Sequence, residues 1–130
     1  MKRSLWTLTL TIAIGALLVV PAIAASPTAS KQVTTDDKGK TVVLVRVSAA
    51  DLNVYGVDIT DATGSIENVE APKGWLGITD GGRLIFRTGN QPIKAGSTLT
   101  FRVYSSNTDA NLKVEFRNQK LATVGQSRSI

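Results

Sequence analysis

Three aromatic side chains have the chemistry to bind a ligand: Trp75, Tyr55 and Tyr104. A flat aromatic ring stacks on the face of a sugar and buries its apolar C–H surface. Tyr104 falls on the polar face of an alternating segment, which favours an exposed ring. Trp75 follows Pro72-Lys73-Gly74, where the chain enters a strand, and a tryptophan placed there also closes one end of a core. The aromatic residues therefore predict a carbohydrate site or, for Trp75, a core position.

Basic side chains form a second candidate site. Residues 25–80 hold five basic and eight acidic residues, whereas residues 81–130 hold eight basic and two acidic ones. If the basic strands share one sheet, they present a basic outer face to an acidic partner or to the next copy of the chain. The alternative is a solvated surface on which the fold mixes the two signs. The basic residues on the outward parity of their strands are Arg83, Arg87, Arg102, Lys113 and Arg117.

Five aspartates raise the question of a calcium site, which needs several oxygens converging on one point. Asp58 and Asp61, followed by Gly64, form the best local pair, but no Asp-x-Asp-x-Asp-Gly loop is present. Aspartate is also a frequent turn residue. We therefore interpret all five as turn residues and predict no metal site. The five are Asp36, Asp37, Asp58, Asp61 and Asp80.

The residue types that most often carry catalysis are missing. The chain has no histidine and no cysteine, which removes the usual general base, thiol catalysis and cysteine-ligated zinc. No Gly-x-Ser-x-Gly motif is present, and none of the acidic residues stands in an apolar context that would raise its pKa. The sequence predicts a protein that is not an enzyme and needs no cofactor. Without a basic cluster interleaved with aromatic residues, it also predicts no nucleic-acid partner.

The N-terminal segment has the features of an export signal. Lys2 and Arg3 precede an uncharged apolar run, and Ala22-Ile23-Ala24 offers small residues at the positions that a signal peptidase reads. We predict a signal helix over residues 1–24 with cleavage after Ala24. The alternative is a retained anchor, because residues 5–25 are long enough to span a bilayer. The predicted location is extracellular or at the cell surface, with membrane contact only through an uncleaved segment.

The elements that position these side chains are strands. Asp80-Gly81-Gly82 separates two short apolar runs, which predicts a tight hairpin. Leu99, Phe101 and Val103 alternate with polar residues and predict a strand with a buried face. Turn residues recur about every ten residues along the chain. We predict an all-β fold with eight or nine antiparallel strands. Residues 25–35 are a flexible lead or a first strand, and residues 36–130 form one β-sandwich domain.

A series of short motifs gives the sandwich a resemblance to a known family. The motifs are Val54-Tyr-Gly-Val-Asp-Ile59, Ala71-Pro-Lys-Gly-Trp75, Leu84-Ile-Phe86 and Pro92-Ile-Lys-Ala-Gly-Ser-Thr-Leu-Thr-Phe101. In this order they resemble exported immunoglobulin-like domains of the cohesin-like sort, in which a Tyr-Gly strand, a Pro-x-Gly-Trp turn and a Gly-x-x-x-x-Phe strand recur. The resemblance spans residues 54–116. It implies a protein-binding or surface-assembly module, and it carries over no specific partner-contact residues.

These observations lead to three expectations about function. The first is a secreted, non-enzymatic binding or assembly module that acts by protein–protein contact at the cell surface, with another protein or itself as the partner. The second is a carbohydrate-binding module that recognises a polysaccharide. The third is a subunit of an extracellular filament, in which residues 25–35 add as a strand to a neighbouring copy.

Overall fold

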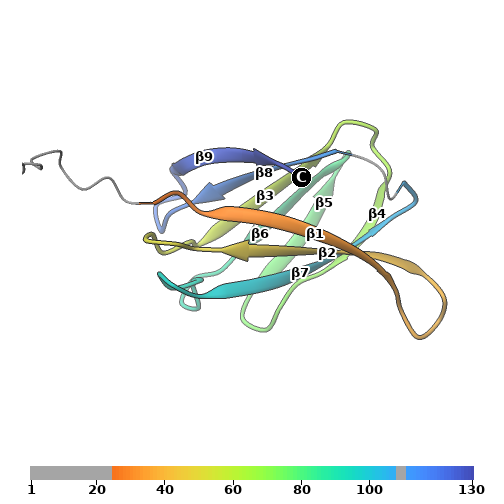
Figure 1. The fold of residues 1–130 in the computed structure, drawn as a ribbon, viewed down its shortest axis with the longest axis horizontal. Helices are drawn as coiled ribbons and strands as arrows, with labels where there is room; N and C mark the ends of the chain where they lie inside the picture. The colour runs from red at the N-terminus through yellow and green to blue at the C-terminus, as the bar shows by residue number, and fades with distance from the viewer. Residues whose placement is uncertain (1–24, 108–110) are drawn as a thin grey trace, which may run out of the picture.

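The computed structural model describes residues 25–107 and 111–130, which form two antiparallel sheets stacked face to face (Figure 1). The predicted signal helix, residues 1–24, lies outside the described residues. Within the described ranges, no helix is long and apolar enough to cross a membrane. The strands are β1 (Thr28–Thr35), β2 (Thr41–Ser48), β3 (Gly56–Asp61), β4 (Ile66–Glu70), β5 (Leu76–Asp80), β6 (Arg83–Arg87), β7 (Thr98–Ser105), β8 (Leu112–Arg117) and β9 (Thr123–Ser129).

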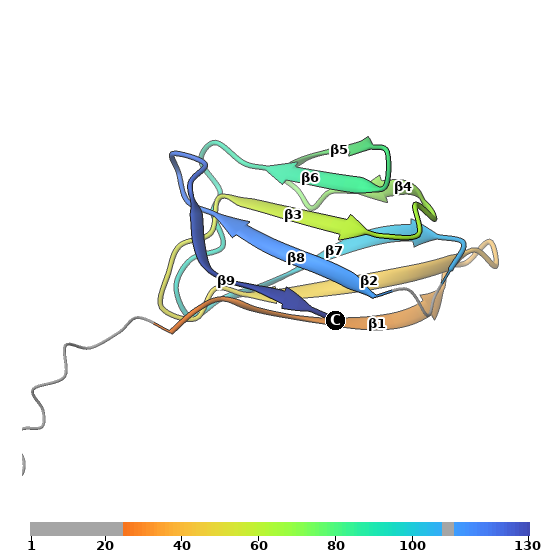
Figure 2. The ribbon, with the colours of Figure 1, turned by 90° about the horizontal axis from the view of Figure 1, so that it is seen from above.

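The two sheets differ in width. One has four strands in the order β1-β2-β7-β4, and the other has five in the order β5-β6-β3-β8-β9. The hairpin of β5 and β6 forms one margin of the five-stranded sheet, and β9 forms the other (Figure 2). Every pairing between neighbouring strands is antiparallel. The nine strands confirm the predicted all-β sandwich.

Residues 25–35 are a strand for most of their length. β1 pairs with β2 from Thr28 opposite Ser48 to Thr35 opposite Thr41. Just before β1, the Arg128 Nε donates to the Pro27 carbonyl at 3.0 Å, which ties the start of the segment to β9. Of the two alternatives for this segment, the structure therefore has the first strand, paired within its own sheet.

The core lies between the sheets and includes four aromatic side chains, three of which pack against one another. Phe101 of β7 stacks edge-on against Trp75, with ring centroids 5.2 Å apart, and lies 4.6 Å from Phe86 of β6. Phe86 and Phe101 are completely buried, and Trp75 is 6% exposed. The alternation over residues 99–103 thus directs Phe101 and Val103 inward, as the sequence predicts. These three rings connect the four-stranded sheet to the β5–β6 hairpin.

The turn between β5 and β6 is the tight hairpin that the glycines predict. Asp80 pairs with Arg83, so the turn has only two residues. Gly81 has a φ of 56° and Gly82 a φ of 86°. Positive φ at both central residues is the pattern of a type I′ turn, which matches the twist of paired strands.

Phe101→Ala tests the aromatic group directly. We expect the free energy of unfolding to fall by about 3–5 kcal/mol, because the truncation leaves a cavity between the two sheets. The measurement is equilibrium unfolding in urea. Thr100→Ala on the same strand, a half-buried position of opposite parity, is the control and should cost less than about 1 kcal/mol. Equal losses for the two variants would contradict the assignment of Phe101 as the central core residue.

Candidate functional site

The structure does not bring together the three aromatic residues that were predicted to bind a ligand. Trp75 is buried between the sheets, and its Nε1 donates to the Gln91 carbonyl at 2.9 Å. Tyr104 lies on β7 in the four-stranded sheet, and Tyr55 immediately precedes β3 in the five-stranded sheet. Both tyrosines are half-buried. The three rings therefore form no common platform.

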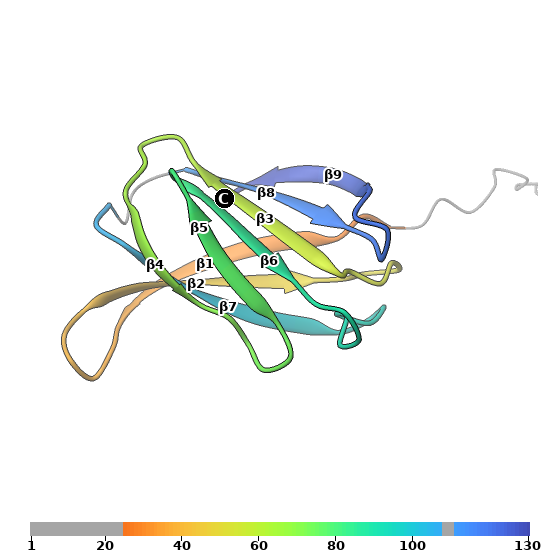
Figure 3. The same ribbon diagram turned by 180° about the vertical axis from the view of Figure 1, so that it is seen from behind.

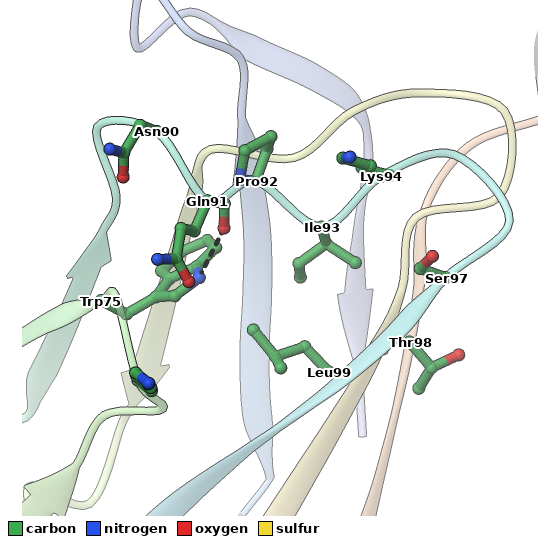
Figure 4. Close-up of a pocket in the computed structure, with 10 residues that line it drawn as sticks. Trp75, Asn90, Gln91, Pro92, Ile93, Lys94, Ser97, Thr98 and Leu99 are labelled. Atoms are coloured by element: carbon green, nitrogen blue, oxygen red, sulfur yellow. Dashed lines mark hydrogen bonds between the residues drawn. The ribbon is translucent and has the colours of Figure 1, made fainter.

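A cleft lies at the end of the sandwich where Trp75 closes the core. It has a volume of about 410 Å³ and is bordered by residues 90–94 of the β6–β7 loop and by the start of β7 (Figure 4). The Trp75 indole points toward the Gln91 carbonyl, so its one polar hydrogen is already used within the protein. Thr88 Oγ1 donates to the Gly74 carbonyl at 2.7 Å and holds the turn before Trp75 in place. These contacts give the tryptophan a structural role.

The predicted basic face is divided between the two sheets. Arg83 and Arg87 lie on β6, and Lys113 and Arg117 on β8, all with outward parity in the five-stranded sheet. Arg102 lies on β7 in the other sheet, where its Nε is 2.9 Å from Glu70 Oε1. The condition for a single basic face, that the strands share one sheet, is therefore not met for Arg102, because β7 pairs with β2 and β4.

A buried carboxylate organises three of the arginines. Asp58 lies in the middle of β3, between β6 and β8, and its side chain is 0% exposed. Arg87 Nη1 donates to Asp58 Oδ1 at 2.6 Å, and Arg117 Nη2 donates to Oδ2 at 2.9 Å. Arg83 Nη2 donates to Oδ2 at 3.2 Å. The prediction that Asp58 is a turn residue is thus wrong, because it occupies a central strand and serves as an acceptor for neighbouring strands.

The arginines determine the charge state of Asp58. Burial by itself raises the pKa of this carboxyl group, because it disfavours the charged form. Hydrogen bonds from Arg87, Arg117 and Arg83 outweigh burial, so the net pKa lies below its ordinary value of 3.8. Asp58 is therefore a carboxylate at neutral pH and holds the guanidinium groups in fixed positions on the sheet.

Acidic residues offset much of the positive charge on this sheet face. By register, Glu115 of β8 lies beside Asp58, and Asp80 of β5 lies beside Arg83. The outward positions of β3, β5, β6 and β8 thus hold four cations and three carboxylates. The fold mixes the two signs here, as the alternative interpretation of the charge asymmetry predicts.

Sequence reasoning missed an apolar patch on the same face. Leu76 and Ile78 on β5 point outward, with 77% and 58% of their surfaces exposed. β5 and β6 lie side by side (Figure 3), and Ile85 of β6 is directly opposite Ile78, between Arg83 and Arg87. We call these five residues, Leu76, Ile78, Arg83, Ile85 and Arg87, the β5–β6 patch. The signal that could have revealed it is the parity of the hairpin, because Phe86 must point inward and its cross-strand neighbour is Gly77.

The other aspartate of the proposed calcium pair has a structural role. Asp61 ends β3 and accepts hydrogen bonds from the Thr63 amide and hydroxyl groups and from the Ser65 hydroxyl group. Ser65 Oγ lies 3.0 Å from Ser105 Oγ on β7, so the network connects the two sheets. Within residues 25–107 and 111–130, no group of three or more potential ligand residues is arranged to hold a metal ion.

Comparison with solved structures identifies the type of fold. No family model matches the chain, and no curated protein matches it. Among solved structures, it is similar to an uncharacterized protein from Nocardia farcinica with an immunoglobulin-like fold. The similarity has a TM-score of 0.58 at 16% sequence identity, and it covers 74% of this chain and 80% of that one. The chain therefore has an immunoglobulin-like fold.

The strand order agrees with this assignment. The order β1-β2-β7-β4 corresponds to the ABED sheet of a constant-type immunoglobulin domain, and β3-β8-β9 corresponds to its CFG sheet. The β5–β6 hairpin is an addition to this plan, because it extends the second sheet beside β3. The β5–β6 patch thus lies on the element that distinguishes this chain from the common seven-stranded domain.

Asp58→Asn tests the arginine cluster. We expect the free energy of unfolding at neutral pH to fall by about 2–3 kcal/mol, because three charged donors lose an ionised acceptor. The loss is at the lower end of values for buried pairs, since the arginine side chains are 20–47% exposed and can be solvated. Asp80→Asn, an exposed position on the same face, is the matched control and should change stability little. If Asp58→Asn left the free energy of unfolding unchanged, the cluster would not stabilise the fold.

The lowered pKa of Asp58 also predicts how stability depends on pH. A carboxyl group with a lower pKa in the folded state stabilises the fold above its unfolded pKa, and the contribution is lost as pH falls through the folded pKa. Asp61, whose pKa is also lowered by hydrogen bonds against the effect of burial, acts in the same direction. Urea unfolding should therefore show stability falling below about pH 4. Asp58→Asn should weaken this dependence, and an unchanged slope would contradict the assignment.

Proposed function

We propose that this chain is a non-enzymatic protein-binding module that acts outside the cell through the β5–β6 patch. The observation that carries the proposal is the pair of adjacent exposed side chains, Leu76 and Ile78, on the outer face of an edge strand. Single exposed aliphatic residues are common on protein surfaces, whereas contiguous apolar patches often mark interaction sites. Ile85 extends the apolar surface onto the next strand.

The composition of the patch suits a protein partner. Protein interfaces combine an apolar centre with arginine and have a polar rim. Here Leu76, Ile78 and Ile85 form the centre, and Arg83 and Arg87 stand on either side of Ile85. Asp58 holds both guanidinium groups in place before any partner arrives, which lowers the entropy cost of ordering them on binding.

Sequence features support the extracellular setting and the type of partner. The N-terminal segment has the pattern of an export signal, and the motif order resembles that of cohesin-like domains, which act as binding or assembly modules. The carbohydrate alternative lacks this support, because its three aromatic residues do not share a face. The filament alternative based on residues 25–35 lacks it as well, because β1 pairs with β2 in the same chain.

Site-specific photo-crosslinking tests the proposal. A benzoylphenylalanine at Ile78 should form a covalent adduct with a protein when the chain is exported by the cells that produce it, and mass spectrometry would identify that protein. Val33 on β1, an aliphatic residue that is 46% exposed, is the matched control position and should give no such adduct. Equal adducts from both positions, or none from Ile78, would contradict binding through the β5–β6 patch.

A further inference from the structure

We propose that a second copy of this chain binds at the β5–β6 patch, with the two β5 strands pairing antiparallel across a two-fold axis at Ile78. The inference rests on the proposed function and identifies the partner. The pairing would join the two five-stranded sheets edge to edge. Its basis is the edge of β5, which no other strand of the described residues covers, together with the hydrogen-bonding groups that this edge presents and the side chains that the pairing brings together.

The four sheet edges differ in how they are protected against pairing. On β1, Lys31 lies opposite Val45 and so has the parity of the core face, and an inward charge disfavours the addition of a strand. β4 has a bulge between Ile66 and Asn68 and carries two glutamates. β9 has an irregular register with β8 and a glycine with positive φ at position 125. Each of these features makes the edge a poor template.

The β5 edge has no inward charge, bulge or irregular register of this kind. Its register with β6 is unbroken from Leu76 to Asp80, and it contains no lysine, no proline and no charged residue before Asp80. A Cβ atom built on Gly77 would lie 3.2 Å from Val69 Cγ2 and 2.8 Å from a Phe86 ring atom. The inner face of β5 is therefore covered at Gly77 by the core residue Phe86 and by Val69 of β4. Among the described residues, β5 pairs with β6 alone.

The hairpin turn determines which backbone groups face the open edge. In a two-residue hairpin, the pair next to the turn exchanges hydrogen bonds, and bonded pairs then alternate along the strands. Asp80, Ile78 and Leu76 therefore direct their backbone groups toward β6. Gly77 and Thr79 direct their N–H and C=O groups away from β6, toward a strand that adds to the edge.

One antiparallel register satisfies these groups between two copies. Gly77 of each copy pairs with Thr79 of the other, and both pairs exchange hydrogen bonds. Ile78 then faces Ile78 of the second copy across the axis, as a non-hydrogen-bonded pair whose side chains are close. A shift of two residues in one direction sets Ile78 against an aspartate, and in the other direction it leaves the Thr79 groups without a strand partner. The free edge of β5 is thus self-complementary.

The side chains on the outer face fit the same register. Ile85 and Ile78 of one copy continue into Ile78 and Ile85 of the other, which makes a row of four isoleucines across the joined sheet. Leu76 lies opposite Asp80 of the second copy, so no like charges meet directly. Cross-strand aliphatic pairs of this kind stabilise a sheet. A symmetric pairing of one surface with itself closes as a dimer and does not continue as a fibre.

The test uses single cysteines, which the chain lacks elsewhere. Ile78→Cys should give a disulfide-linked dimer under mild oxidation, because the two Cα atoms at the axis lie within the range that a disulfide spans. Leu76→Cys is the matched control. Its side chain is more exposed, but in this register the two copies of residue 76 lie about 14 Å apart, too far to link. Sedimentation velocity of the full-length protein without substitutions should show a dimer.

Thr79→Pro provides the complementary variant. Proline removes an N–H group that faces the open edge and leaves the pairing of β5 with β6 intact, so we expect a folded monomer. The proposal is overturned if the unmodified protein is a monomer, if Leu76→Cys links as readily as Ile78→Cys, or if Thr79→Pro remains dimeric while folded. If the protein is a monomer but still forms a photo-adduct from Ile78 with a different protein, only the inference that the partner is a second copy is overturned. The proposed protein-binding function then stands.

Discussion

The stacking of Phe101 on Phe86 and Trp75 is the contact on which the rest of the structure depends. It joins β7 of the four-stranded sheet to the β5–β6 hairpin, which the fold adds to the immunoglobulin-like plan. Because the Phe86 ring takes up the space beside β5, only a glycine fits at position 77. The parity of β5 follows from this fit, since Leu76 and Ile78 must then point to the opposite face. The exposure of Leu76 and Ile78 is thus a consequence of the packing of Phe86 against Gly77.

The outer face of the five-stranded sheet carries two kinds of interaction side by side. Around β3, Asp58 and its arginines form an ionic cluster in which strong hydrogen bonds offset the cost of burying the carboxylate. Around β5, aliphatic side chains are open to solvent. Arg83 and Arg87 belong to both regions, because β6 lies between them. A partner that covers the apolar region would therefore meet guanidinium groups whose positions are already determined.

The edges of the two sheets differ in how open they are to pairing with another strand. A sandwich of open sheets leaves four edge strands, and each is a potential site of uncontrolled association. Three of the edges here contain a charge on the core face, a bulge or an irregular register. The fourth is regular, and it borders the exposed aliphatic residues. This regular edge is the one at which we propose that a second copy of the chain pairs.

The sequence by itself determined the local features of this protein. Alternation placed Phe101 and Val103 in the core, and two consecutive glycines after Asp80 predicted a hairpin whose φ values the structure confirms. These features depend on residues close together in the chain, whose geometry follows from parity and turn chemistry. The absence of histidine and cysteine likewise narrowed the possible chemistry before any fold was known.

Only the tertiary structure decided how distant segments meet. Asp58 looked like a turn residue because its arginine partners lie 25, 29 and 59 positions away along the chain. Arg102 looked like a member of the basic face because nothing local assigns β7 to the other sheet. The β5–β6 patch was missed for another reason, because a leucine and an isoleucine in a strand are expected to be buried. Strand order decides which faces are covered, and it depends on long-range pairing that no short stretch of sequence encodes.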